Sequence, residues 1–99
     1  MHDREHLSSV FEALAHPVRL ELVALLAADR GGPGLGVTAL AAKAEISRFS
    51  ASFHLEKLRA AGLVRKVKVG TSWRHFLADT ALDTIDDWLL DVLDVAAAS

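Results

Sequence analysis

The sequence of 99 residues contains no cysteine. This absence excludes a disulfide framework, a thiolate metal site and a thiol redox switch, because each of them needs the cysteine sulfur. The chain also has no apolar run that approaches the roughly 20 residues of a membrane helix, and it does not begin like a signal peptide. These absences favour a single cytoplasmic domain, residues 1–99, without a membrane partner.

A short chain also limits how much surface the fold can bury. A domain of this size buries only about 60–65% of the surface that its unfolded chain exposes, so its core is marginal. Contact with a second copy is a natural way to bury more, and we therefore expect a homodimer.

Positive charge is scarce outside the middle of the chain. Residues 77–99 contain six Asp and no Lys or Arg, and residues 1–42 carry three Arg against five acidic residues. Residues 43–76 hold eight Lys or Arg against two Glu, a local balance of +6. A basic segment in an acidic frame is typical of a face that binds a polyanion, although an ordinary solvated face would show the same excess.

Apolar residues recur at helical spacing in two segments near the start of the chain. Leu7, Val10, Phe11 and Leu14 predict a helix over about residues 3–15, which ends before Pro17. A second helix begins at this proline, where its missing N–H group is tolerated, and the glycine-rich stretch of residues 29–36 then forms a flexible loop.

A helix-turn-helix is predicted over about residues 38–61. Thr38 is a suitable N-cap for a short helix that ends at Ala44, and Ser47 is a suitable N-cap for the next helix. Gly62 offers the left-handed conformation that commonly follows the end of a helix. The brief turn between the two helices is the signature of this motif.

A β-hairpin over about residues 63–78 and a final helix over about residues 80–96 complete the prediction. Gly70 supplies the tight turn between two β-branched and aromatic runs, and a further short strand is expected at residues 36–37. Thr80 and Asp83 resemble a capping box at the start of the last helix. The expected fold is mainly α with a small β-hairpin, a winged helix-turn-helix.

The second helix of the motif has residues suited to the major groove of DNA. Arg48 pairs well with guanine and Ser52 can donate or accept, while Phe49 and Phe53 could touch thymine methyl groups. The other candidate DNA-binding residues bring positive charge, helix N-terminal N–H groups or an imidazole, and they are Lys43, Ser47, Ser50, His54, Lys57, Arg65, Lys66, Lys68 and Arg74.

Several of these residues have a structural alternative. As core residues, Phe53 could instead pack against the hairpin and Phe49 could support the corner of the helix-turn-helix. Trp73 and Phe76 are expected in the core. His54 is expected to meet either a phosphate or the corner of the helix-turn-helix. Lys66 and Lys68 alternate with valines, as they would on any half-buried strand.

The segments "ALAHPVRLELVALL", "TALAAKAEISRFSASFHLEKLRAAGLV" and "VGTSWRHFLA" together resemble the ArsR/SmtB family of small bacterial winged-helix transcription factors. The resemblance covers about residues 7–90. It implies a homodimer, formed through the first and last helices, that binds an inverted-repeat operator and usually represses transcription. The apolar residues that suit such an interface are Leu7, Phe11, Leu82, Ile85, Trp88, Leu89 and Val92, although this surface could also be buried within one chain.

The residues of the family's metal sites are missing. The positions of the arsenic-type cysteines hold Gly36 and Thr38, and residues 80–99 contain no histidine for a zinc- or cobalt-type site. His2 and His6 lie one helical turn apart and could share a metal, but terminal residues are usually poorly ordered. We therefore predict no metal and no cofactor. The sequence leaves open an unidentified small-molecule effector.

No catalytic constellation is evident, so an enzyme is not expected. The predicted function is a DNA-binding transcriptional regulator, with double-stranded DNA and a second copy of the chain as partners. The alternative is a winged-helix module that binds another protein and does not read DNA.

Overall fold

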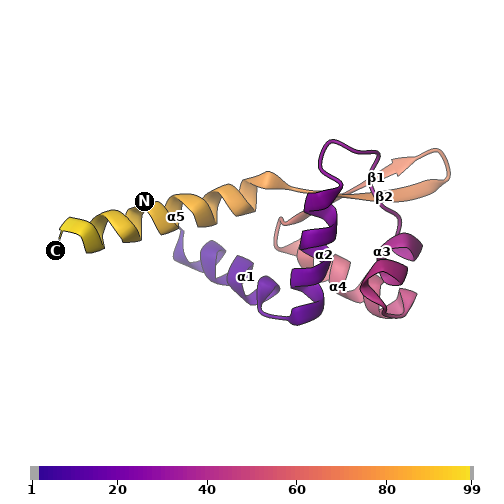
Figure 1. The fold of residues 1–99 in the computed structure, drawn as a ribbon, viewed down its shortest axis with the longest axis horizontal. Coiled ribbons are helices and arrows are strands. Elements are labelled where there is room, and N and C mark those ends of the chain that lie inside the picture. Colours follow the sequence, from indigo (N-terminus) through magenta and orange to yellow (C-terminus); the bar gives the residue numbers. More distant parts are fainter. Residues whose placement is uncertain (1–2, 99) are drawn as a thin grey trace.

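A computed structural model describes residues 3–98, with side chains described for residues 3–94. The elements follow in the order α1 (Arg4–Leu14), α2 (Pro17–Ala28), α3 (Val37–Ala44), α4 (Arg48–Ala60), β1 (Val64–Val69), β2 (Ser72–Leu77) and α5 (Asp79–Ala98). In Figure 1, α1 to α4 form the body, the hairpin projects from one side of it, and α5 projects from the other. The fold class predicted from the sequence, mainly α with one small hairpin, is confirmed.

Side-chain caps fix where three of the helices begin. Asp3 caps α1, and the Nδ1 atom of His16 accepts the N–H of Val18 at 3.2 Å, directly beside the proline that opens α2. The Oγ atom of Ser47 accepts the N–H of Ser50 at 3.0 Å, as predicted.

The predicted caps at Thr38 and Thr80 are wrong. The N-cap of α3 is Gly36, without a side-chain cap, so Thr38 lies inside the first turn. Helix α5 begins at Asp79, where an acidic side chain suits the helix dipole, and Thr80 likewise lies inside the helix.

The core gathers apolar side chains from all the helices and from β1. Its fully buried members include Val10 of α1, Leu22 of α2, Leu40 of α3 and Leu58 of α4, together with Leu63 just before the hairpin. Leu55 and Leu58 lie on the inner stripe of α4 that helical spacing predicts. This packing holds α4 against the body and leaves its opposite face to solvent.

The hairpin is antiparallel, with Val64 paired to Leu77 at its base and Val69 paired to Ser72 at its tip. Gly62 and Gly70 adopt positive φ angles, of 79° and 64°, as predicted for a helix end and a tight turn. The short strand expected at residues 36–37 is instead a single bridge between Leu35 and His75, with two backbone hydrogen bonds of 3.1 and 2.8 Å. This bridge ties the middle of β2 to the loop before α3.

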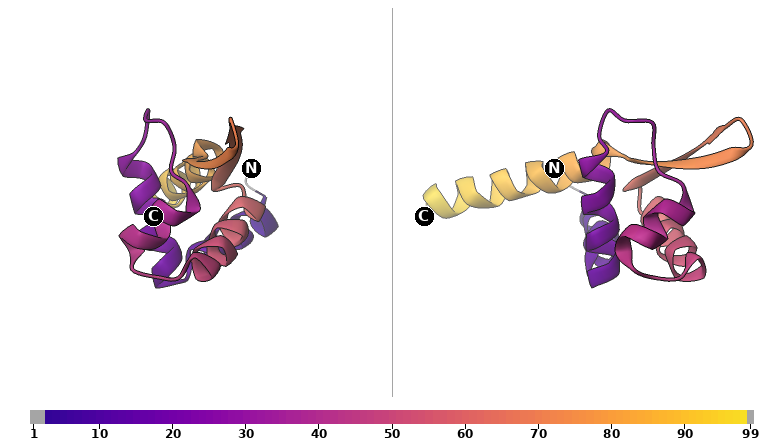
Figure 2. Two further views of the ribbon diagram at one scale, coloured as in Figure 1. Left: turned by 90° about the vertical axis from the view of Figure 1, so that its right-hand side faces the viewer. Right: turned by 45° about the vertical axis from the view of Figure 1, so that its right-hand side comes forward.

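The first half of helix α5 packs on the body. Ala81 is buried, and Leu82 and Ile85 pack against the core, while the ring of Trp88 meets that of Phe11 edge-on at 5.5 Å. Figure 2 shows the remaining turns extending away from the body, on the side opposite to the hairpin. No helix in residues 3–98 is long and apolar enough to cross a membrane.

Candidate DNA-binding surface

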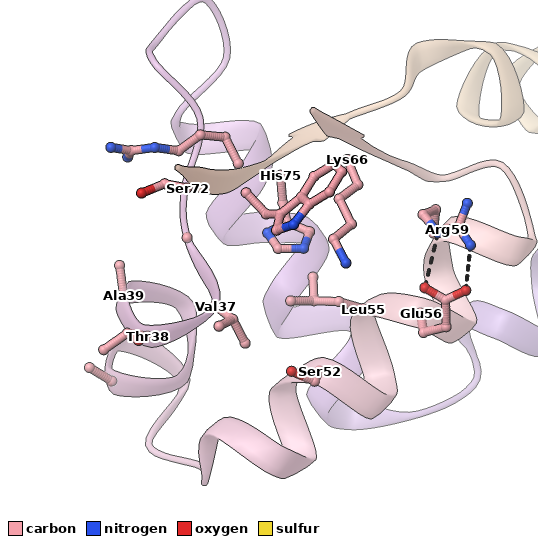
Figure 3. Close-up of a pocket in the computed structure, with 14 residues that line it drawn as sticks. Val37, Thr38, Ala39, Ser52, Leu55, Glu56, Arg59, Lys66, Ser72 and His75 are labelled. Atoms are coloured by element: carbon pink, nitrogen blue, oxygen red, sulfur yellow. Dashed lines mark hydrogen bonds and ion pairs between the residues drawn. The ribbon is translucent and has the colours of Figure 1, made fainter. Parts of the chain in front are cut away.

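A groove of about 660 Å³ lies between the helix-turn-helix and the hairpin. Val37, Thr38 and Ala39 line it from α3, and Ser52 and Leu55 line it from α4. In Figure 3, the side chains of Lys66 and His75 enter it from the hairpin, opposite α4. The groove therefore joins the basic hairpin to one flank of α4.

The exposed side of α4 carries the residues predicted to read bases. Ser52 and Arg59 line the groove, and Arg48 lies four residues before Ser52 on the same exposed stripe. Phe49 and Phe53 lie on the face of α4 directed away from the buried stripe. Their side chains are 86% and 53% exposed, which excludes the core alternative for both residues.

An ion pair on α4 changes the charge balance of the groove. The guanidinium of Arg59 donates two hydrogen bonds to the carboxylate of Glu56, at 2.9 and 2.5 Å, three residues along the helix. The hydrogen bond from Arg59 lowers the pKa of Glu56. Because this pair is locally neutral, Lys66 is the cation that gives the groove-facing side of the hairpin its positive charge. Arg74 also lines the groove, but it pairs with Val67 and its side chain therefore lies on the other face of the hairpin. The pair was not predicted, although its i, i+3 spacing is a recognisable signal.

Trp73 was expected in the core, and this prediction is wrong. The indole is 49% exposed and stands on the groove-facing side of the hairpin. The Nζ atoms of Lys66 and Lys68 lie 5.0 and 5.9 Å from the centre of its ring. The exposed ring attracts both ammonium groups through its negative face, and it therefore gathers positive charge on the hairpin.

Two other basic residues of the hairpin are arranged differently. Arg65 pairs with Phe76 across the strands, and its guanidinium carbon lies 5.2 Å from the Phe76 ring. Because side chains alternate along a strand, these two lie on the face opposite to Lys66 and Trp73. Arg74 lines the groove, but its Nη1 atom also donates to the carbonyl of Gly34 at 3.3 Å. The structure therefore does not bring Arg65 to the groove.

His54 is buried at the corner of the helix-turn-helix, so it does not meet a phosphate. Its Nδ1 atom accepts from Nε of Arg19 at 3.3 Å, and its ring lies 4.5 Å from that of His16. The inner stripe of α4 includes position 54, which places this imidazole between α4 and the junction of α1 with α2. We therefore remove His54 from the candidate DNA-contacting residues.

The remaining predicted residues lie at the edges of this surface. Ser47 and Ser50 stand at the N-terminus of α4, whose free N–H groups can bind a phosphate. Lys43 is exposed in the last turn of α3. Lys57 lies on the far flank of α4, with its Nζ atom 5.4 Å from the centre of the Phe53 ring.

Of the predicted dimer residues, Leu7 is buried within the single chain. It therefore belongs to the packing of α1 and cannot supply free interface area, contrary to the prediction. Phe11, Leu89 and Val92 are exposed, as are Leu90 and Leu93, which were not among the predicted interface residues. His2 lies outside the described residues, so the pair formed with His6 is not described. Among the described side chains, no cluster of three or more His, Cys, Asp or Glu could hold a metal ion.

Two buried histidines predict that acid destabilises the fold. Burial lowers the pKa of His54 below the usual 6.5, helped by His16 and Arg19, and burial also lowers the pKa of His75. A histidine whose folded pKa is lowered contributes stability above its unfolded pKa and loses it as the pH falls through the folded value. We expect the free energy of unfolding, measured with urea, to decline from about pH 7 to pH 5, and His75→Gln to reduce that slope. A flat profile over this range would contradict the assignment.

Comparison with known proteins places this surface in a family. Residues 14–67, which span α2 to the middle of β1, match the family model described as a helix-turn-helix domain. The chain belongs to this helix-turn-helix family. No curated protein matches the sequence.

Solved structures specify the type of this helix-turn-helix protein. An ArsR-like transcriptional regulator from Rhodococcus sp. RHA1 is 29% identical with a TM-score of 0.80, over 95% of this chain and 85% of that one. A homodimeric winged helix-turn-helix DNA-binding domain from Mycobacterium bovis is 27% identical with a TM-score of 0.69, over 92% and 82% of the two chains. An ArsR family transcriptional regulator at 22% identity shares the fold, with a TM-score of 0.85 over 100% and 99%.

The helix-turn-helix protein is thus of the ArsR type, as the resemblance in its sequence implied. It is a DNA-binding transcriptional regulator. Proteins of this family and fold are regulators and not enzymes.

Proposed function

We propose that this regulator is a homodimer that binds an inverted-repeat operator and represses transcription. The observation that carries the proposal is the continuous surface formed by α4, from Ser52 to Arg59, and the basic, groove-facing side of the hairpin. An α-helix fits the major groove, and a hairpin beside it can reach the adjacent backbone or minor groove. A dimer that occupies an operator represses by keeping the polymerase from the same DNA.

The dimer part of the proposal rests on α5. Leu89, Leu90, Val92 and Leu93 are exposed on the turns that extend beyond the body, and Leu93 is 62% exposed. Phe11 adds an exposed ring beside Trp88. Exposed apolar surface of this kind marks an interface, and a twofold dimer presents two recognition helices that match an inverted repeat.

The proposal is tested by selecting a random duplex library on the purified protein at physiological salt and sequencing the retained DNA. We expect an enriched inverted repeat with half-sites about 34–36 Å apart, one helical turn. Transcription from a template that carries this repeat near the promoter should fall when the protein is added. Absence of any enriched sequence would favour the alternative, a module that binds another protein.

Salt dependence separates these two functions independently of sequence. The logarithm of a DNA-binding constant falls with the logarithm of salt concentration by about 0.9 for each phosphate contact, because counterions are released. Several lysines and arginines on the proposed surface predict a steep slope. Binding to a protein partner through the exposed phenylalanines would show a shallow slope.

Arg48 and Lys66 are expected to have different roles. Arg48→Ala should weaken specific binding by about 1–3 kcal/mol and relax one base position, because arginine pairs with guanine through two hydrogen bonds. Lys66→Ala should weaken binding to every duplex alike and lower the salt slope by about 1, because a phosphate contact carries no sequence information. Titrations of both variants on the selected site and on random duplex measure this. Equal losses on the two duplexes for both variants would contradict the assigned roles.

The groove also has room for the small-molecule effector that the sequence leaves open. Its volume of about 660 Å³ falls within the range of about 300–1,000 Å³ typical of ligand sites. A ligand bound between α4 and the hairpin would occupy the space that the DNA backbone needs. Such an effector should therefore release the operator and raise the melting temperature of the free protein.

A further inference from the structure

Phe49 is the most exposed large apolar side chain among the described residues, at 86% of its surface. No other described ring or cation stacks on it, whereas Phe53 has both the ring of His54 and the ammonium of Lys57 close by. Exposure of a whole phenyl ring to water is unfavourable, by about 25 cal/mol for each Å² of apolar surface. The fold itself gives no reason for this ring, because Phe49 supports neither the core nor the hairpin.

The position of Phe49 indicates what could cover the ring. It is the second residue of α4, directly after Arg48. It therefore lies in the first turn of the helix, which Ser47 caps by accepting the N–H of Ser50. In helix-turn-helix proteins the N-terminal residues of the second helix contact base edges. The main apolar group on those edges is the 5-methyl group of thymine, which makes favourable contact with phenylalanine.

We propose that Phe49 determines part of the operator sequence by apolar contact with a thymine methyl group, beside the base that Arg48 reads. The inference rests on the proposed function, since it requires α4 to enter the major groove. Phe53 is one helical turn further on, about 6 Å along the axis, and is half covered. We therefore assign the methyl contact to Phe49, and we expect Phe53 to lie at the margin of the contact with DNA.

The test replaces thymine by deoxyuridine in the operator obtained by selection. This change removes only the methyl group and leaves every hydrogen-bonding group of the base unchanged. Each thymine is replaced in turn, symmetrically in both half-sites, and the affinity is measured by titration. At one position we expect wild-type protein to lose affinity about fourfold per half-site, or roughly 15-fold for the pair, the effect of removing one buried methyl group.

Three variants assign the loss to a residue. Phe49→Ala should bind the thymine duplex more weakly than wild type and show no further loss with deoxyuridine at that position. Phe53→Ala is the matched control, the same change one turn away, and should keep the full penalty. Phe49→Leu should show part of the wild-type loss of affinity with deoxyuridine, because leucine can also contact the methyl group. Thermal melting should be unchanged for Phe49→Ala, because this side chain has little contact to lose.

The possible results separate the inference from the function on which it rests. A library selection without any enriched sequence would refute the proposed function before deoxyuridine is used. With a selected operator in hand, several results would overturn the inference. These are a wild-type affinity that is insensitive to deoxyuridine at every position, a methyl penalty that persists in Phe49→Ala, and an operator without thymine in its half-sites. Full DNA binding by Phe49→Ala would likewise overturn it and would point to a protein partner for this ring.

Discussion

Leu89→Asp is expected to convert the dimer into monomers and to lower operator affinity by about 10²- to 10⁴-fold, the gain that linkage of two binding modules provides. Leu89 is half exposed in the free chain, among the apolar residues of the second half of α5. An aspartate there would be buried without a partner in the dimer, which is strongly unfavourable. In the monomer it would remain in water, so the fold should survive.

Light scattering gives the oligomeric state, and titration of the operator gives the affinity. Thr80→Asp is the matched control, because it adds the same charge to α5 at an exposed position in its first turn, away from the apolar residues. The control should remain dimeric. The dimer hypothesis fails if Leu89→Asp is monomeric yet binds the inverted repeat as tightly as wild type. It also fails if the wild-type protein is itself monomeric at concentrations that saturate the operator.

The elements of the fold could be predicted from the sequence because each is determined by local signals. Pro17 and Gly62 mark the start of α2 and the end of α4, Ser47 caps α4, and Gly70 forms the turn of the hairpin. The predicted caps at residues 38 and 80 were wrong because each helix begins one residue before its threonine. A threonine in the first turn of a helix gives the same sequence pattern as a threonine that caps it. The first residue of a helix depends on the path of the preceding segment, which is set by the tertiary structure.

Burial of individual aromatic and imidazole side chains could not be predicted in the same way. Trp73 is large and apolar, which favours the core, but the hairpin projects beyond the body, so its tip has no core to enter. The opposite happened at His54, whose position on the inner stripe of α4 outweighs its polarity because Arg19 satisfies its Nδ1 atom. Leu7 was assigned to an interface because the sequence cannot distinguish a partner subunit from the chain's own helices.

The candidate site follows from sequence only in part. The buried stripe of α4 indicated that Arg48 and Ser52 point outward, and the structure places both on exposed positions. The sequence did not indicate that Glu56 would neutralise Arg59, or which face of the hairpin would line the groove. The ion pair depends on the rotamers of two side chains of α4, and the facing of the hairpin depends on how it packs against the body.

The loop before α3 illustrates the same limit and leads to a second large effect. Its glycines predicted a flexible connection, but Gly34 is buried and holds the hairpin. Its N–H group donates to Asp29 at 3.0 Å and its carbonyl accepts from Arg74 at 3.3 Å. It has a φ angle of +83°, and a Cβ atom there would lie 2.6 Å from the ring of Phe76 and 2.9 Å from Cβ of Arg74.

Gly34→Ala is therefore expected to lower the free energy of unfolding by about 2–4 kcal/mol, because left-handed strain and a steric clash act together. Gly31→Ala isolates the first of these, since Gly31 has a φ angle of +81° but nothing within 4 Å of an added Cβ. Gly31→Ala should lower the free energy of unfolding by about 1–2 kcal/mol in urea denaturation.

The Phe76 ring can turn aside, but Cβ of Arg74 is fixed to the strand, so relief of the clash requires the hairpin to move away from the loop. A displaced hairpin would shift Lys66 and Trp73 relative to α4, so Gly34→Ala should weaken binding to all duplexes at temperatures where it is still folded. Gly31→Ala should bind DNA normally. Equal stability of the two variants would show that the loop yields to the added methyl group and does not hold the hairpin in place.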